Sequence, residues 1–263
     1  MLDSVGPAPV AQRIECRPPE PEAQVRVLPG APTTAAAPYD GALMTDPRTM
    51  RAPTGFHEDR PLDREDLLGD PIEQFRRWLA DAEAAEVPLP NAMALATADA
   101  EGRPSVRNVL LRGVDERGFE FFTNYDSRKG RQLAANPHAG LVFLWKELDR
   151  QVSLNGPVAR TSATESDAYF ATRPRDAQLG AWASNQSEVL AGRGELEERL
   201  AEVGARFPGA VPRPEHWGGF LLTPVAIEFW QGRRHRLHDR LRFTALARTG
   251  TTGERWRVER LSP

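Results

Sequence analysis

The sequence predicts a mainly β protein, an antiparallel β-barrel with peripheral helices. First, short apolar-rich segments with strand-like periodicity follow one another between residues 92 and 162. Second, turn-forming residues separate them, as in the hairpin signal DERGF at 115–119. Third, the helical segments are few and short, and most consecutive strands are joined without one. Helical crossovers would be needed for a doubly wound parallel sheet, so the antiparallel barrel is favoured.

The first 50 residues stand apart from this pattern. They are rich in Pro, Ala, Gly and Thr and show little apolar periodicity. We expect them to be disordered, or to be spurious if translation begins at Met44 or Met50. The folded domain is then expected to span residues 51–263.

Order is expected to begin near Asp70, where Pro71 suits the first turn of a helix. In IEQFRRWLADAEAAEV, one face of that helix collects Ile72, Phe75, Trp78 or Leu79, and Ala82. The period then changes to that of strands. Strands are expected at 92–99, 105–113, 119–124, 139–145 and 150–162.

Three helices are expected after the first one. The segment 127–137 has a candidate N-cap at Ser127 and a stop at Asn136-Pro137. The segment from Ser162 carries the capping-box pattern with Glu165. The third covers 194–207. The segments 218–230, 241–248 and 255–261 are expected to supply two or three final strands.

Composition excludes several classes of function. The formal net charge of −3 gives no support for general nucleic-acid or membrane-surface binding. Cys16 is the only cysteine, so no intramolecular disulfide and no multi-cysteine metal site can form. No signal peptide and no apolar run of transmembrane length is present, so the expected location is the cytoplasm.

Two segments suggest anion binding. In RNVLLR, Arg107 and Arg112 bracket an apolar strand, but strict alternation points them to opposite faces, so joint use needs a bulge or a wrapping ligand. In FTNYDSRKGRQL, a strand ends and a helix opens with Arg128 and Lys129 in its first turn. Cations at a helix N-terminus are unfavourable without an anion, so this segment fits a phosphate site.

Two further segments extend the pattern. Tyr169 and Arg173 lie four apart and would share a helix face, ahead of the neutral donors Gln186 and Ser187. Near the C-terminus, Trp230 offers a flat face for a planar ring. Arg236 and His238 lie two apart, so on an extended strand they would point the same way.

Other chemistries lack their sequence motifs. There is no G-x-S-x-G, Walker, H-E-x-x-H or G-x-G-x-x-G motif. The five histidines lack metal-ligand spacing with carboxylates, so no metal site is expected. Several anion-binding segments and flat aromatics without a nucleophile indicate a cofactor that supplies the chemistry.

Taken together, these segments resemble the pyridoxine/pyridoxamine 5′-phosphate oxidases. The resemblance runs from about residue 50 to the C-terminus, through the motifs RNVLLR, FTNYDSRK, RQV, YFATRPR, QLGAWASNQS, WGGF, IEFWQG and RLHDR in order. It implies an FMN-binding split β-barrel and a homodimer with FMN at the subunit interface. It also implies oxidation of the two B6 phosphates by O2 to pyridoxal 5′-phosphate, with hydrogen peroxide, and ammonia from the amine.

The resemblance also implies roles for residues. The FMN set is Arg107, Asn108, Val109, Leu110, Leu111, Arg112, Phe122, Thr123, Arg128, Lys129, Gln151, Gln186, Ser187, Trp230 and Arg240. The substrate set is Arg51, Arg112, Tyr169, Arg173, Ala177, Arg236, Leu237 and His238. Within the second set, Arg236 and His238 are expected to lie over the pyridine ring and to be the catalytic pair.

The chain departs from the family pattern on the substrate side. Arg112 stands where the family usually has Lys, Ala177 where it has Ser, and Thr54 where it has a Tyr that closes over substrate. Phe122 replaces a Tyr. These departures leave two alternatives: a related flavin oxidase of another aromatic such as a dihydrophenazine precursor, and a non-catalytic FMN- or pyridoxal-phosphate-binding protein.

Overall fold

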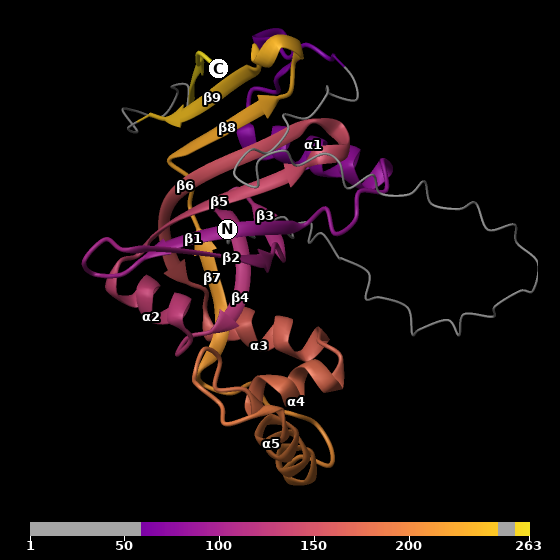
Figure 1. Cartoon of the computed structure of the whole chain (residues 1–263), viewed down its shortest axis with the longest axis vertical. Helices are drawn as coiled ribbons and strands as arrows, with labels where there is room; N and C mark the ends of the chain where they lie inside the picture. The colour runs from indigo at the N-terminus through magenta and orange to yellow at the C-terminus, as the bar shows by residue number, and fades with distance from the viewer. Residues whose placement is uncertain (1–58, 247–255) are drawn as a thin grey trace, which may run out of the picture.

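A computed structural model describes residues 59–246 and 256–263 of the chain as one curled antiparallel sheet with five α-helices around it (Figure 1). The strands are β1 (Ala92–Ala98), β2 (Pro104–Leu110), β3 (Gly113–Asp115), β4 (Gly118–Asn124), β5 (His138–Trp145), β6 (Arg150–Arg160), β7 (Trp217–Leu222), β8 (Ala226–Gln231), β9 (Asp239–Ala245) and β10 (Trp256–Arg260). The helices are α1 (Pro71–Ala84), α2 (Arg128–Ala135), α3 (Ala163–Thr172), α4 (Arg175–Ala183) and α5 (Arg193–Arg206). The expectation for residues 1–50 lies outside the described residues.

Strand β6 belongs to both branches of the sheet. Its first half pairs with β8 over Arg150–Asn155, and its last three residues pair with β7. One branch runs β10-β9-β8-β6-β5-β1-β2, and β7, β4 and β3 form the other. Between the two halves lies Gly156, where a Cβ atom would fall 2.0 Å from the carbonyl oxygen of Thr223. Only glycine permits that close approach, which lets the sheet curl into a half-barrel.

Helix α1 forms as its sequence predicts and closes the core of the half-barrel. Asp70 caps it, accepting from the backbone N–H of Ile72 at 2.7 Å, and Pro71 occupies the first turn. The ring of Phe75 packs at 4.8 Å against Phe119 and also against Phe143. Because each such buried aromatic contributes about 1.5–3 kcal/mol, this cluster is a principal source of stability.

A second apolar cluster lies under the helices that follow β6. Phe170 of α3, Leu179 of α4 and Trp217 of β7 meet there with Val211. The capping box of α3 is present, with Ser162 Oγ accepting from the N–H of Glu165 at 3.1 Å. This cluster fixes α3 and α4 beside the end of β4.

The structure corrects three expectations. Helix α4 is not predicted by the sequence, because Pro174 indicates only the end of α3; in the structure it also serves as the N-cap of α4. The strand expected at 105–113 is two strands, β2 and β3, and the segment 218–230 is also two strands, β7 and β8. Pro224 lies in the connection between β7 and β8, where its lack of an N–H removes a ladder bond.

Within the described ranges, no helix is long and apolar enough to cross a membrane.

Candidate functional site

A pocket of about 760 Å³ lies where β2, the end of β4, the first turn of α2, α3 and α4 meet. The loop after α4 closes one side with Gln186 and Ser187. The lining residues come from four separate stretches of the chain, 105–112, 122–129, 169–187 and Trp217.

Strand β2 lines the pocket along its edge. It pairs only with β1, and six consecutive residues, Ser105 to Leu110, line the cavity. Consecutive side chains of a strand point to opposite faces, so a wall made by all six must be the strand's edge. An edge strand offers backbone N–H and C=O groups that no other strand uses. A planar ligand with donors and acceptors on its rim can pair with such an edge.

The charge of the pocket is all of one sign. Its lining holds five cationic side chains, and none of the lining residues in the described part of the chain is Asp or Glu. The five are Arg107, Arg112, Arg128, Lys129 and Arg173. Such an unbalanced cluster is costly without an anion, so the pocket is built to hold one or more strongly anionic groups.

The Arg107 guanidinium is held by a polar network beneath it. Nη1 donates to the backbone oxygen of Leu95 at 3.0 Å and to Thr97 Oγ1 at 2.7 Å, while Nη2 donates to Ser105 Oγ at 2.9 Å. Buried Gln132 accepts from the hydroxyls of Thr97 and Ser105. Burial and, second, the charge of Arg128 lower the pKa of Arg107 from its usual value. All of these partners are neutral, so the positive charge stays available to a ligand.

Lys129 is buried among neutral acceptors. Its Nζ donates to Gln186 Oε1 at 2.7 Å, to Thr123 Oγ1 at 3.1 Å and to Ser127 Oγ at 3.3 Å. Burial and, second, the charge of Arg107 lower the pKa of Lys129 to about 8. A buried ammonium held by these neutral oxygens keeps its charge for a ligand, which is what a phosphate site requires.

The start of α2 faces this charge. Ser127 is the N-cap, as predicted, accepting from the N–H of Gly130. A Cβ atom on Gly130 would lie 2.0 Å from the carbonyl oxygen of Tyr125, so glycine is required for the tight turn into the helix. Ser187 Oγ accepts from the N–H of Arg128 at 3.2 Å, joining the loop after α4 to the same turn.

An aromatic stack forms another wall. The rings of Phe122 and Tyr169 stack with centroids 4.0 Å apart, and Trp217 stacks on Phe122 at 5.5 Å. The guanidinium of Arg173 lies over Trp217 at 4.6 Å, and its Nη1 is buried with no hydrogen-bond partner in the described residues. Burial lowers the pKa of Arg173. A buried guanidinium N–H at a pocket wall is a donor prepared for an anionic ligand.

Arg107 and Arg112 do line one pocket, and the break between β2 and β3 makes this possible. Strand β2 ends at Leu110, and the N–H of Arg112 instead bonds to the carbonyl oxygen of Glu120 on β4. The strict alternation that separated the two arginines therefore stops before Arg112. Leu111 turns inward to the core, where it is 3% exposed.

The C-terminal segment forms a separate cluster. Gln151, Trp230 and Arg240 are cross-strand neighbours on β6, β8 and β9, and we call them the Trp230 row. None of them lines the pocket. Arg240 is bound to Glu228 through both Nε, at 2.8 Å, and Nη2, at 3.0 Å. Figure 1 places β8 and β9 toward one end of the molecule and α3 and α4 toward the other.

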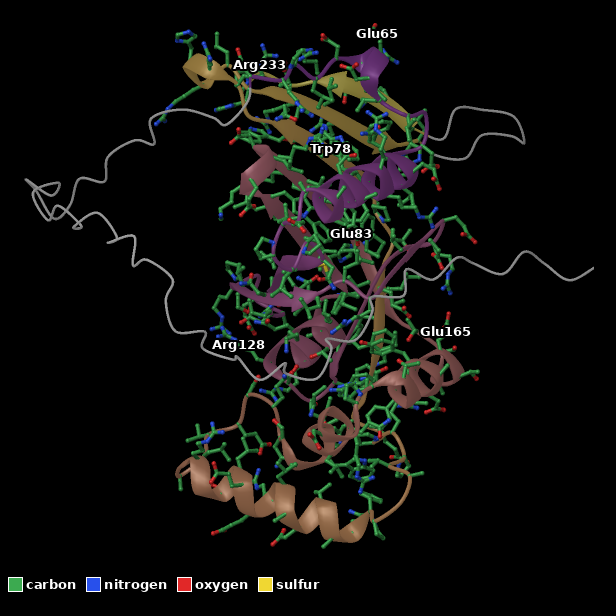
Figure 2. The ribbon with its side chains drawn as sticks, turned by 90° about the vertical axis from the view of Figure 1, so that its right-hand side faces the viewer. Glu65, Trp78, Glu83, Arg128, Glu165 and Arg233 are labelled. Atoms are coloured by element: carbon green, nitrogen blue, oxygen red, sulfur yellow. The ribbon has the colours of Figure 1, made fainter. Side chains whose placement is uncertain are left out.

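The side chains show the same separation. Figure 2 places Arg233, which follows β8 in the chain, near one end of the long axis, and Arg128 of the pocket far below it. Arg236, Leu237 and His238 do not line the pocket either. Arg51 and Thr54 lie outside the described residues, eight and five positions before Asp59 respectively.

The condition under which Arg236 and His238 would point the same way, an extended strand, is not met. Arg236 ends a short 3-10 helix, η4 (Arg234–Arg236), and both His235 (φ 58°) and Arg236 (φ 61°) adopt the left-handed conformation. Such residues cost of order 1 kcal/mol or more each unless the surroundings hold them. The ring of His238 packs against Trp230 at 4.6 Å.

Of the expected site residues, the pocket therefore collects Arg107, Asn108, Val109, Leu110, Arg112, Phe122, Thr123, Arg128, Lys129, Tyr169, Arg173, Ala177, Gln186 and Ser187. Sequence reasoning missed Ser105, Val106, Asn124, Gly180, Ala181, Ser184 and Trp217 as lining residues. Ser105 and Val106 were missed because the motif RNVLLR begins at Arg107, and Gly180, Ala181 and Ser184 were missed because helix α4 was not predicted. In the described ranges no group of three His, Cys, Asp or Glu side chains is placed to hold a metal ion.

Sequence comparison gives this site a family context. Residues 79–207 match the family model described as pyridoxamine 5′-phosphate oxidase, and residues 217–263 match the pyridoxine 5′-phosphate oxidase C-terminal dimerisation region. A pyridoxine/pyridoxamine 5′-phosphate oxidase of Paraburkholderia phytofirmans is 55% identical over 77% of this chain and 93% of its own length. One of Thermosynechococcus vestitus is 59% identical over 75% of this chain and 91% of its own.

Solved structures agree on the fold. PhzG from Burkholderia lata 383, in complex with tetrahydrophenazine-1-carboxylic acid, is 34% identical with a TM-score of 0.71, covering 78% of this chain and 99% of PhzG. A pyridoxamine 5′-phosphate oxidase-related, FMN-binding protein from Nostoc punctiforme is 19% identical with a TM-score of 0.56, covering 72% and 97% of the two chains. At that identity the second likeness shows the fold alone, a split barrel.

Proposed function

The chain belongs to the pyridoxine/pyridoxamine 5′-phosphate oxidase family, and from that premise we propose that it oxidises pyridoxine and pyridoxamine 5′-phosphates to pyridoxal 5′-phosphate with FMN as cofactor. The observation that carries the proposal is the pocket with five cations and, among its described lining residues, no carboxylate. Both the cofactor and the substrates carry a phosphate dianion, and both present a planar ring.

The residues present fit FMN. The phosphate of FMN matches the first turn of α2, where Arg128 and the buried Lys129 lie. The rim of the flavin ring carries donors and acceptors that suit the backbone edge of β2. When bound, FMN would supply the acceptor for a hydride from C4′ of the substrate, and its reoxidation by O2 would yield hydrogen peroxide.

We assign the substrate phosphate to the other end of the pocket. Arg173 offers Nη1, which is buried and has no hydrogen-bond partner in the described residues. The guanidinium carbon of Arg112 lies 5.9 Å from the centroid of the Tyr169 ring, which stacks on Phe122. Arginine binds phosphate through parallel N–H donors, so two guanidiniums and a phenol can hold the dianion in one orientation. Holding the phosphate fixes the distance of the reacting carbon from the cofactor.

We infer that a second copy of the chain completes the site. The Trp230 row and His238 lie apart from the pocket in one chain, and β8 and β9 belong to the segment that matches the dimerisation region. A homodimer that sets the row of one protomer against the pocket of its partner would add Gln151, Trp230 and Arg240 to the FMN site. It would bring Arg236 and His238 to the substrate ring, where they orient it and assist proton movement.

The amine and alcohol substrates differ only at C4′. Loss of hydride from the alcohol leaves the aldehyde after its hydroxyl proton departs. The amine gives an imine, which water hydrolyses to the same aldehyde and ammonia. The residues of this chain bind and orient either substrate through the phosphate, which both share.

The test is aerobic turnover of FMN-loaded protein with pyridoxamine 5′-phosphate, following pyridoxal 5′-phosphate and peroxide together. Equal amounts of both products support the proposal. Bound FMN without turnover of either B6 phosphate would favour an oxidase of another aromatic, such as a dihydrophenazine precursor, and reduced tricyclic acids should then be tried. Failure of all of them, with tight FMN binding retained, would indicate a binding protein.

A further inference from the structure

The loop from Gly232 to His238 joins β8 to β9 and needs an external restraint. Two consecutive non-glycine residues in it, His235 and Arg236, are left-handed. Its two ends are fixed by the sheet, since Gln231 pairs with Asp239. Between those ends, a loop with this backbone relaxes unless side chains hold it.

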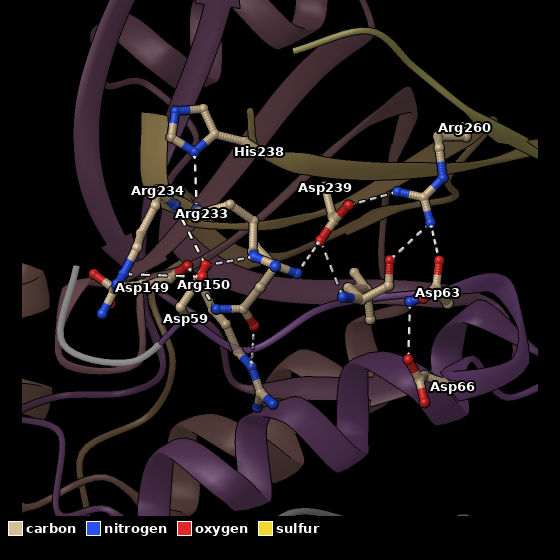
Figure 3. Close-up of polar contacts among 12 residues, drawn as sticks. Asp59, Asp63, Asp66, Asp149, Arg150, Arg233, Arg234, His238, Asp239 and Arg260 are labelled. Atoms are coloured by element: carbon tan, nitrogen blue, oxygen red, sulfur yellow. Dashed lines mark hydrogen bonds and ion pairs between the residues drawn. The ribbon is translucent and has the colours of Figure 1, made fainter. Parts of the chain in front are cut away.

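Two hydrogen bonds of Arg233 join the start of the loop to its end, at His238 and at Asp239, the first residue of β9 (Figure 3). Its backbone N–H donates to Nδ1 of His238 at 3.1 Å. Its side chain bonds to the residue that follows His238, with Nη1 donating to Asp239 Oδ2 at 3.1 Å. A third contact runs outward, from Arg233 Nε to Asp59 Oδ1 at 2.6 Å.

The two carboxylates that hold Arg233 have further partners, and those of Asp239 lie outside the loop. Asp239 also accepts from Arg260 Nη1 at 2.6 Å and from the N–H of Leu62 at 3.1 Å. Asp59 also accepts from the N–H of Arg234 at 3.4 Å. Arg233 thus links the loop to the last strand and to the segment before α1, as the dashed lines in Figure 3 show.

We propose that Arg233 is a positioning residue for His238, holding the ring in one orientation and as one tautomer. A nitrogen that accepts a hydrogen bond from an N–H carries no proton, so the neutral ring has its hydrogen on Nε2. The ion pairs of Arg233 with Asp59 and Asp239 keep that backbone N–H in place. The proposal rests on the proposed function only in that His238 acts on the substrate.

The surroundings of His238 agree with a neutral ring. Burial and, second, the charge of Arg236 lower the pKa of His238, while Asp239 opposes them. Because Asp239 is bonded to both Arg233 and Arg260, its negative charge is largely balanced. Trp230 covers one side of the imidazole.

The experiment compares the intact dimeric, FMN-loaded protein with its Arg233→Ala variant by 15N NMR of histidine-labelled samples, using His238→Gln to assign the signal. In the parent protein, His238 is expected to show the Nε2–H tautomer. In Arg233→Ala, the two tautomers should mix and the pKa of His238 should rise, since the backbone N–H of residue 233 is no longer held against Nδ1 and the cation that balances Asp239 is lost.

Steady-state kinetics supply a second measurement. Misplacement of an orienting group is expected to lower kcat/KM of Arg233→Ala by about ten- to a hundred-fold while the affinity for FMN stays unchanged. Arg233→Lys keeps a cation between the carboxylates and should recover part of the loss. Asp59→Asn removes one of the two carboxylate partners of Arg233 and should cause a smaller loss of the same kind. The double variant should lose little more than Arg233→Ala alone, because Asp59 acts through Arg233.

The matched control is Arg103→Ala. Arg103 also bridges two carboxylates, Asp99 and Glu101, but in the turn between β1 and β2. The Arg103→Ala variant should leave the tautomer and pKa of His238 unchanged, and kcat/KM as well. An unaltered His238 tautomer and pKa in Arg233→Ala would overturn the proposal, as would a kinetic loss no larger than that of Arg103→Ala. If Arg233→Ala fails to fold, Arg233→Lys and Asp59→Asn decide by the same readouts.

The two proposals fail differently. If the parent protein binds FMN but turns over neither B6 phosphate, the proposed function is lost, yet the NMR comparison still tests the hold of Arg233 on His238. If the parent protein oxidises the B6 phosphates but the tautomer and pKa of His238 are the same in Arg233→Ala, only the positioning role is lost.

Discussion

Lys129 and Gln186 are joined by a hydrogen bond of 2.7 Å that ties the first turn of α2 to the loop after α4. The bond crosses the pocket wall between two segments separated by 57 positions. It places a buried ammonium where the helix N-terminus already favours an anion. The pairing therefore builds, from both sides, the end of the pocket that we assign to the FMN phosphate.

Lys129→Met should weaken FMN binding strongly. A charge-assisted hydrogen bond is worth about 1.5–3 kcal/mol, so the dissociation constant should rise by about 10- to 150-fold. Titration followed by quenching of flavin fluorescence measures this directly. Lys146, the only other lysine, is exposed and pairs with Glu147, so Lys146→Met is the matched control and should bind FMN as the parent does.

FMN binding should weaken as the pH rises above about 8. Burial and the charge of Arg107 lower the pKa of Lys129 to about 8, and a bound dianion favours the charged form. Binding above that pH then takes up a proton, so the dissociation constant should rise by up to about tenfold per pH unit. The same titration repeated from about pH 7 to 9.5 tests this. In Lys129→Met that part of the pH dependence should disappear.

The FMN-free protein should show the opposite trend in stability. The pKa of Lys129 falls from the ordinary lysine value of 10.5 to about 8 in the folded chain, so between these values the unfolded chain binds more protons. The contribution of Lys129 to the free energy of unfolding therefore rises with pH over this window. Urea melts give the free energy of unfolding at each pH. Its slope against pH in this window should differ between the FMN-free parent and FMN-free Lys129→Met. Parallel slopes would contradict the assignment.

Arg173→Gln should raise KM for the phosphorylated substrate and leave FMN affinity intact. Removing one charged donor to the phosphate costs about 1.5–3 kcal/mol, which predicts a loss of kcat/KM of about 10- to 150-fold. The decisive comparison is with pyridoxamine lacking phosphate, for which the variant and parent should be alike. Arg175, two positions on, reaches the carbonyl oxygens of Phe207 and Gly209 and does not line the pocket, so Arg175→Gln is the control.

Ala177→Ser should tighten substrate binding. Ala177 lines the pocket from the first turn of α4, four positions after Arg173, and a hydroxyl there would add a donor for the same phosphate. One added hydrogen bond of about 0.5–1.5 kcal/mol predicts a KM lower by up to about tenfold. Ala171→Ser, at an exposed position of α3, should leave KM unchanged. An unchanged KM in Ala177→Ser would mean that the phosphate lies away from α4.

The local elements were predictable because their signals are local. Asp70 and Pro71 at the start of α1, the capping box of Ser162 and Glu165, and the Ser127 cap of α2 all appear as the sequence indicates. Each depends on side chains within one helical turn of the backbone that they bond. Helix α4 was missed because Pro174 both ends one helix and begins the next, and only the packing of Leu179 and Ala181 decides that the chain continues as helix.

The sequence by itself determined the antiparallel β class, the cationic segments and, through their order, the family. It did so because periodicity, caps and motifs are properties of neighbours in the chain. Only the tertiary structure decided that Arg107 and Arg112 share a pocket, through the break after Leu110, and that the Trp230 row lies away from it. It also decided that Arg236 is left-handed and that Arg233 bonds His238. Those facts depend on contacts between strands and on side chains up to 174 positions apart, such as Asp59 and Arg233, which no local pattern encodes.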